Sequence, residues 1–279
     1  MKDFAVKLNI LFFLIFSSFI CSGKQEIDNT KSNTSSSGND NTKETNSIKK
    51  TTSKDDIIIK TSDSKELSAS YYYNSETIET SQPLVILIHQ FNQTKEQWKS
   101  DFTDSLVNSG IKVLTYDIRG HGKSSKVSYE LSRLLDDPDE APNDIKACFE
   151  WAKNQNGIDF TRIGVMGTSI GGNLACYAAI NLNAKAIVSV SNSKSTFEIY
   201  AGYDEKSMRP PKINKFKNSL FICGSKDGDH EQEQKWIMEN FADDPKELKV
   251  YDSEKHGMFL IEQFPEINTL SINWFKKYL

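Results

Sequence analysis

The sequence has few cysteines and histidines, the residues that build disulfide frameworks and many metal sites. Its 279 residues include four cysteines, with no CxxC pair, and four histidines scattered along the chain, so no metal-ligand spacing is present. The net charge is only −4 and no strongly basic stripe occurs, which argues against a nucleic-acid-binding surface. We therefore expect no metal, no cofactor and no nucleic-acid partner.

Three of the four cysteines indicate core positions. Cys148, Cys176 and Cys223 each lie in an apolar pattern. Free cysteine behaves as a small hydrophobe, so we interpret these three as buried core residues rather than as disulfide partners or reactive thiols.

The first 23 residues are typical of an export signal. Lys2 and Lys7 give a basic start, and an apolar run from Leu8 to Ile20 follows. About thirteen residues are too few to span a bilayer but suit the apolar core of a signal peptide. We interpret residues 1–23 as that signal.

Cys21 directly follows the apolar run and precedes Ser22-Gly23. This resembles the lipobox of bacterial lipoproteins, although Ile20 stands where a small residue is usual. The resemblance implies an acylated Cys21 that anchors the protein in a membrane of the bacterial envelope, on the periplasmic side or at the surface. The alternative is ordinary cleavage after Gly23, which would give a secreted protein.

Residues 24–55 are almost entirely polar. Such a segment cannot bury enough apolar surface to offset its chain entropy, so it is predicted to be a disordered linker. The folded domain is predicted to span residues 56–279.

Strand and helix patterns alternate through this domain, which indicates an α/β fold. The sheet is expected to be mostly parallel, with about eight strands, right-handed crossovers and helices on both faces. The expected strands are 57–61, 67–73, 84–88, 111–116, 161–166, 186–190, 219–223 and 247–252, the first two being an antiparallel pair. The expected helices are 94–109, 140–155, 170–182, 230–241 and 258–278. A small cap is expected between the strands at 186–190 and 219–223.

The pattern Gly167-x-Ser169-x-Gly171 lies between an expected strand and an expected helix. A serine on so sharp a turn needs a strained backbone, and its flanks must be small. The helix that follows directs free N–H groups and a partial positive charge towards the place where an oxyanion would form. The pattern therefore predicts a nucleophile; the alternative is a glycine-rich turn without chemistry.

A nucleophilic serine needs a histidine base that is oriented by an acid. In a strand–turn–helix architecture the expected chain order is serine, acid, histidine. Downstream of Ser169 the histidines are His230 and His256. His256 follows the last strand and is predicted to be the base, whereas His230 opens a helix in an acidic run and is interpreted as a solvated residue.

The acid should lie in the loop after the strand that ends at Cys223. Asp227 is predicted because that loop reaches the carboxyl end of the sheet, where such sites form. Asp229 is the reserve. Considered singly, Asp227 would be interpreted as a turn residue and His256 as a surface-loop histidine.

Several motifs together resemble the α/β-hydrolase superfamily, in its serine esterase and dienelactone-hydrolase-like branch, across about residues 56–279. They are His89-Gln90-Phe91 with Trp98 downstream, Asp117-x-Arg119-Gly120-His121-Gly122-x-Ser124, the Ser169 turn, Gly224-x-x-Asp227 and His256-Gly257.

The resemblance implies an oxyanion hole formed by the backbone N–H groups of Phe91 and Ile170. Gln90 departs from the glycine that is usual there, so its side chain could reach the site. The resemblance also implies orienting rather than catalytic roles for His89, Arg119 and His121, as well as a metal-independent hydrolase.

The expected substrate class is small to medium carboxylic esters. Thioesterase and peptidase activities stay open because one triad serves all three, and the alternative from another class is a surface-displayed binding module with little catalysis.

Overall fold

The structure, a computed structural model, describes residues 52–203 and 213–279. The expected signal peptide, Cys21 and residues 24–51 of the expected linker lie outside these ranges. Within the described ranges, no helix combines the length and the apolar character needed to cross a bilayer. The first strand begins at Thr52 rather than at Ile57, and its partner residues run from Asn74 back to Glu66.

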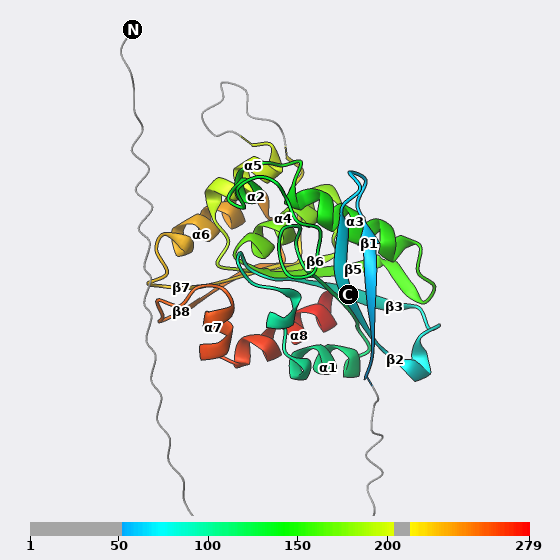
Figure 1. The fold of residues 1–279 in the computed structure, drawn as a ribbon. Coiled ribbons are helices and arrows are strands. Elements are labelled where there is room, and N and C mark those ends of the chain that lie inside the picture. Colours follow the sequence, from blue (N-terminus) through cyan, green and yellow to red (C-terminus); the bar gives the residue numbers. More distant parts are fainter. Residues whose placement is uncertain (1–51, 204–212) are drawn as a thin grey trace, which may run out of the picture. The chain divides into compact units, whose positions relative to one another are not determined.

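Eight strands in the described residues form one sheet in the order β1-β2-β4-β3-β5-β6-β7-β8 (Figure 1). Only β2 runs antiparallel to its neighbours, and every other pair is parallel. The strands are β1 (Thr52–Lys60), β2 (Glu66–Asn74), β3 (Gln82–Ile88), β4 (Lys112–Tyr116), β5 (Ile158–Thr168), β6 (Ala186–Val190), β7 (Ser219–Gly224) and β8 (Lys246–Tyr251). The expected α/β architecture is confirmed.

Helices cover both faces of this sheet. The α-helices are α1 (Ser100–Asn108), α2 (Arg133–Asp136), α3 (Ala141–Lys153), α4 (Ile170–Asn181), α5 (Lys194–Ala201), α6 (His230–Phe241), α7 (Met258–Gln263) and α8 (Glu266–Tyr278), and short 3-10 turns lie at η1 (Ser75–Thr77) and η2 (Lys95–Gln97). In Figure 1, α1, α7 and α8 lie on one face, and α2 to α6 lie on the other. Two apolar cores result, one for each face.

Strand β3 shows how the sequence pattern produces these two cores. Leu84, Ile86 and Ile88 pack into the core on the α3–α6 face, whereas Val85 and Leu87 pack into the core on the α1 and α8 face. Because successive side chains point to opposite faces, a continuous β-branched and leucine run fits a strand covered on both sides.

Two expected helices are interrupted. The helix expected over 258–278 is divided into α7 and α8 because Pro265 follows Phe264, whose backbone leaves the helical region (φ −125, ψ 77). A proline disfavours helical geometry in the residue before it and lacks an N–H to continue the ladder. The helix expected over 94–109 is divided into η2 and α1 at Trp98, which is extended (φ −77, ψ 104).

The predicted cysteine environments are confirmed. Cys148, Cys176 and Cys223 are free and buried. In the segment where a cap was expected, α5 follows β6, and the Tyr200 hydroxyl donates a hydrogen bond to the backbone carbonyl of Leu134 in α2. Part of that segment, residues 204–212, lies outside the described ranges.

Arg119, in the loop after β4, is fully buried and connects three parts of the fold. Its guanidinium contacts Asp144 at 2.7 Å, Asp63 at 2.7 Å and Glu140 at 3.0 Å. Its backbone N–H also donates to Asp144, at 2.8 Å. The planar fork of arginine suits several carboxylates at once, so this side chain holds the β1–β2 turn and α3 against the loop after β4.

Candidate active site

Ser169 lies between β5 and α4 in an unusual backbone conformation, with φ 55 and ψ −117. A Cβ at Gly167 would lie 2.1 Å from the backbone of Gly171, and a Cβ at Gly171 would lie 2.4 Å from the carbonyl oxygen of Ile88. Both flanking residues therefore have to be glycine. The Ser169 N–H donates to the carbonyl of Val190 at 2.8 Å, so the turn is held by β3 on one side and β6 on the other.

Helix α4 begins directly after this serine, at Ile170. The first N–H groups of a helix have no partner within it, and the peptide dipoles add partial positive charge at that end. Ser169 itself is half-buried at the carboxyl end of β5. The local geometry thus places a hydroxyl next to backbone donors that can stabilise a negative charge.

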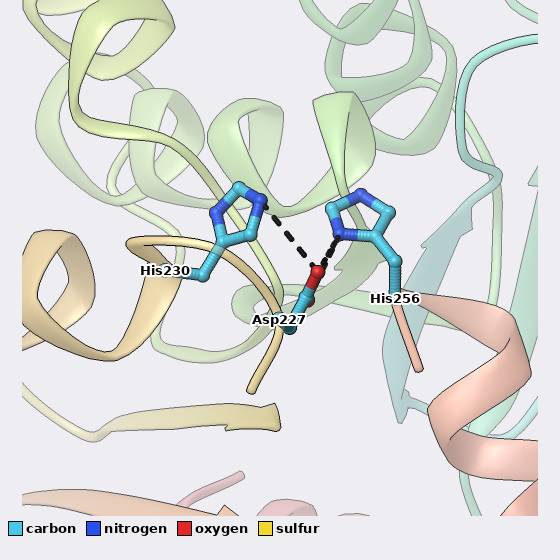
Figure 2. A group of neighbouring side chains, drawn as sticks. All are labelled: Asp227, His230 and His256. Atoms are coloured by element: carbon cyan, nitrogen blue, oxygen red, sulfur yellow. Dashed lines mark hydrogen bonds and ion pairs between the residues drawn. The ribbon is translucent and has the colours of Figure 1, made fainter. Parts of the chain in front are cut away.

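His256 and Asp227 form a hydrogen-bonded pair. The His256 Nδ1 lies 2.9 Å from Oδ2 and 3.1 Å from Oδ1 of Asp227 (Figure 2). The two residues come from the loops after β7 and β8, which are neighbouring parallel strands, so their carboxyl ends meet. Asp227 is largely buried and accepts the Nδ1 proton, which leaves Nε2 of His256 as a proton acceptor. Asp229, the reserve candidate, is exposed.

The loop that carries His256 lies against the serine turn. The N–H of Gly257 donates to Oγ of Ser191 at 3.0 Å, and Ser191 follows β6 directly. A Cβ at Gly257 would lie 3.4 Å from Cβ of Thr168, the residue before Ser169. The predicted nucleophile and the predicted base are therefore carried by adjoining backbone segments.

Gln90 connects the loop after β3 to both of these segments. Its Oε1 accepts a hydrogen bond from the N–H of Met258 at 2.7 Å, two residues beyond His256. Its own N–H donates to Gln97 at 3.2 Å, and Gln97 donates in turn to Oγ1 of Thr168 at 3.0 Å. The Gln90 side chain thus reaches the histidine loop, and Gln97 is a contributor that the sequence motifs did not reveal.

Two buried histidines position the loops that follow β3 and β4. Nε2 of His89 accepts from the N–H of Ile118 at 2.9 Å, and its Nδ1 lies 2.8 Å from the carbonyl of Gln90. Nε2 of His121 accepts from the N–H of Asn92 at 3.1 Å, and the His121 ring packs edge-on against Phe91, which is half-buried. Both histidines thus make contacts suited to the orienting role expected for them.

His230 is not the solvated residue that the acidic run suggested. Its side chain is only 21% exposed, its ring centroid lies 4.8 Å from that of His256, and its Nε2 lies 4.0 Å from Oδ1 of Asp227 (Figure 2). Burial lowers the pKa of His230, but the hydrogen bond with Glu233 and the charge of Asp227 outweigh burial and raise it. His230 lies three positions after Asp227, and the junction from loop to helix turns both side chains towards His256 (Figure 2).

One continuous segment of the chain matches the model of a known protein family. Residues 83–220 match the family model described as alpha/beta hydrolase fold. An uncharacterized 31.7 kDa protein of Escherichia coli, from the traX-finO intergenic region, is 36% identical over 108 residues, which cover 38% of this chain and 36% of that protein. This chain spans less than half the length of the curated relatives that it matches.

Solved structures of similar fold cover more of the chain. An esterase of Pyrococcus furiosus, Pf2001, is 21% identical, with a TM-score of 0.60, and the match covers 81% of this chain and 90% of the esterase. An acetyl xylan esterase from Paenibacillus sp. R4 is 17% identical, with a TM-score of 0.62 and coverage of 84% and 86%. At these identities the likeness establishes the fold alone.

Proposed function

Because the chain is an α/β-hydrolase-fold protein, we propose that it is a serine hydrolase that cleaves small to medium carboxylic esters. The proposal rests on one observation: the strained Ser169 turn lies against the loop of His256, whose Nδ1 is hydrogen-bonded to Asp227 at 2.9 Å. Esterases among the structural relatives support the general activity, and the ester class follows from the sequence resemblance.

The proposed mechanism is acyl transfer to water. Ser169 attacks the ester carbonyl while Nε2 of His256 removes its proton, and Asp227 holds the imidazole in the required tautomer. The backbone N–H groups of Phe91 and Ile170 stabilise the oxyanion, and loss of one such donor typically costs about 10²–10³ in turnover. The alcohol leaves with the proton from His256. His256 then activates water, which releases the acid from the acyl-enzyme.

The experiment is covalent labelling of the full chain with a fluorophosphonate probe, with hydrolysis of short p-nitrophenyl esters measured in parallel. The variants are Ser169→Ala, His256→Ala and, as a matched control, Ser225→Ala, which alters an exposed serine near Asp227. We expect labelling and turnover in wild type and in the control but in neither active-site variant. A folded wild type that is not labelled would overturn the proposal and leave the binding module as the better interpretation.

The leaving group separates the activities that one triad can support. We propose that oxygen esters exceed both thioesters and p-nitroanilides in kcat/KM when the acyl group is held constant. A higher kcat/KM on the thioester or the anilide would reassign the protein to that activity while leaving the nucleophile unchanged.

We further propose that the protein is exported and anchored through acylated Cys21. The support is the sequence of residues 1–23 alone. Partition into a detergent phase is the test: wild type should enter it and Cys21→Ser should not. Equal partition of both would favour cleavage after Gly23 or no anchoring.

A further inference from the structure

Asp227, His230 and His256 bring three potential metal ligands together at one edge of the sheet (Figure 2). One nitrogen from each histidine and one carboxylate oxygen all lie within 4.8 Å of one another. The three residues are carried by the loop after β7, the first turn of α6 and the loop after β8. The ends of two adjacent strands therefore fix the positions of all three.

The contacts of His230 determine which nitrogen is available. Its Nδ1 lies 3.2 Å from the carbonyl oxygen of Asn192 and 3.3 Å from a carboxylate oxygen of Glu233. A backbone carbonyl and a carboxylate oxygen both accept hydrogen bonds, so Nδ1 of the neutral ring carries the proton, and the lone pair of Nε2 faces the Asp227 carboxylate at 4.0 Å. Metal-bound histidines have this same arrangement, in which the second ring nitrogen donates to a carbonyl or a carboxylate.

We propose that Asp227, His230 and His256 form a Zn²⁺ site that inhibits the hydrolase by capturing its catalytic histidine. Two imidazole nitrogens and one carboxylate oxygen match zinc, which accepts three protein ligands and a water, whereas Ca²⁺ and Mg²⁺ prefer oxygen ligands. Ligand atoms around a tetrahedral zinc ion lie about 3.4 Å apart. Oδ1 of Asp227 lies 3.1 Å from Nδ1 of His256 and 4.0 Å from Nε2 of His230. These separations fall on either side of that value, so small side-chain rotations can close the site.

The chemistry of inhibition follows from the pairing of His256. Its Nδ1 lies against Asp227, so a zinc ion bound between them takes the Nδ1 lone pair and the imidazole proton moves to Nε2. No proton is gained or lost in this shift. Nε2 is then protonated and cannot accept the proton of Ser169. Inhibition rests on the proposed function, whereas zinc binding does not.

Calorimetric titration of the full chain with ZnCl₂ in a non-chelating buffer tests the site. Wild type and Ser169→Ala should bind one zinc ion, and neither should bind Ca²⁺ there. Because loss of an outer-shell partner already costs 10–100-fold in metal affinity, His230→Gln and His230→Asn should lose more than about 100-fold. Asp229→Asn is the matched control: it removes an exposed acid beside His230 and should bind zinc like wild type.

Ester hydrolysis with and without zinc tests the inhibition, with each variant compared with its own metal-free rate. Zinc should inhibit wild type and Asp229→Asn but not the His230 variants, whose fold is checked by circular dichroism. Equal zinc affinity in wild type and in folded His230 variants would overturn the site, as would no binding to wild type. If wild type binds zinc but hydrolyses no ester even without zinc, the proposed function is contradicted and the zinc site still stands.

Discussion

Gln90 offers the sharpest test of how the loops around Ser169 are held together. Its Oε1 accepts the buried N–H of Met258 at 2.7 Å, and a Cβ on Gly257 would lie only 2.3 Å from the same oxygen. The perturbation is Gln90→Leu, which keeps the approximate volume but removes the acceptor. The backbone N–H at position 90 still donates to Gln97, so only the bond to the histidine loop is lost.

The magnitude follows from leaving one buried amide without a partner. Such a group costs about 1–3 kcal/mol in the free energy of unfolding. In a domain of this size each kcal/mol lowers Tm by about 2–4 °C, so 2 kcal/mol corresponds to about 4–8 °C. Because the freed loop carries His256, and a misplacement of 1 Å can cost about 100-fold in rate, kcat should fall by about ten- to a hundredfold, with little change in KM.

The assays are guanidinium denaturation, ester kinetics and hydrogen exchange of the Met258 amide. Gln93→Leu is the matched control because it makes the same chemical change at an exposed position and should alter stability by less than about 0.5 kcal/mol. Faster exchange at Met258 in Gln90→Leu would localise the effect. If Gln90→Leu equals Gln93→Leu in stability and exchange, the side chain does not hold the histidine loop and the reasoning fails.

Three further predictions concern the framework of the site. Gly171→Ala should destabilise the fold by about 1–3 kcal/mol, because its Cβ would lie 2.4 Å from the Ile88 carbonyl; unchanged thermal unfolding would contradict this. Burial lowers the pKa of His89 from 6.5 to about 4. Between pH 6.5 and pH 4, the His89 side chain is therefore protonated in the unfolded chain but neutral in the folded chain. The free energy of unfolding should therefore fall by about 3 kcal/mol on acidification from pH 6.5 to pH 4. It should fall by clearly less in His89→Gln, which keeps an acceptor for the N–H of Ile118. Equal losses in the two proteins would show that His89 does not cause the pH dependence. Arg119→Met leaves the buried carboxylate of Asp144 without its charged partner and should cost about 3–5 kcal/mol in urea denaturation, with Arg119→Lys intermediate.

Much of the fold could be predicted because local patterns dictate it. The run Leu84–Ile88 reads as a strand buried on both faces, and the glycines around Ser169 are required by backbone approaches of 2.1 and 2.4 Å. The division between α7 and α8 also has a local cause, because Pro265 stands within an otherwise helical pattern and disfavours helical geometry at Phe264.

The remaining features of the site depend on tertiary geometry that no local pattern encodes. Gln90 contacts a residue 168 positions away, and that partner is set by where the loops after β3 and β8 meet. His230 faces Asp227 because of the direction in which α6 leaves β7. Acidic neighbours in the sequence predict a solvent-exposed side chain, whereas the path of the chain turns the His230 side chain inward.

The Ser169 turn has a consequence for the order of folding. A positive φ at a serine costs about 1–3 kcal/mol, so it persists only where the surroundings enforce it. Those surroundings are the Val190 carbonyl at the end of β6 and the Ile88 carbonyl at the end of β3. Parallel pairing across long stretches of chain is slow, so these neighbours come together late. A serine-reactive probe added during refolding should therefore report completion of the central sheet, well after helical signal has returned.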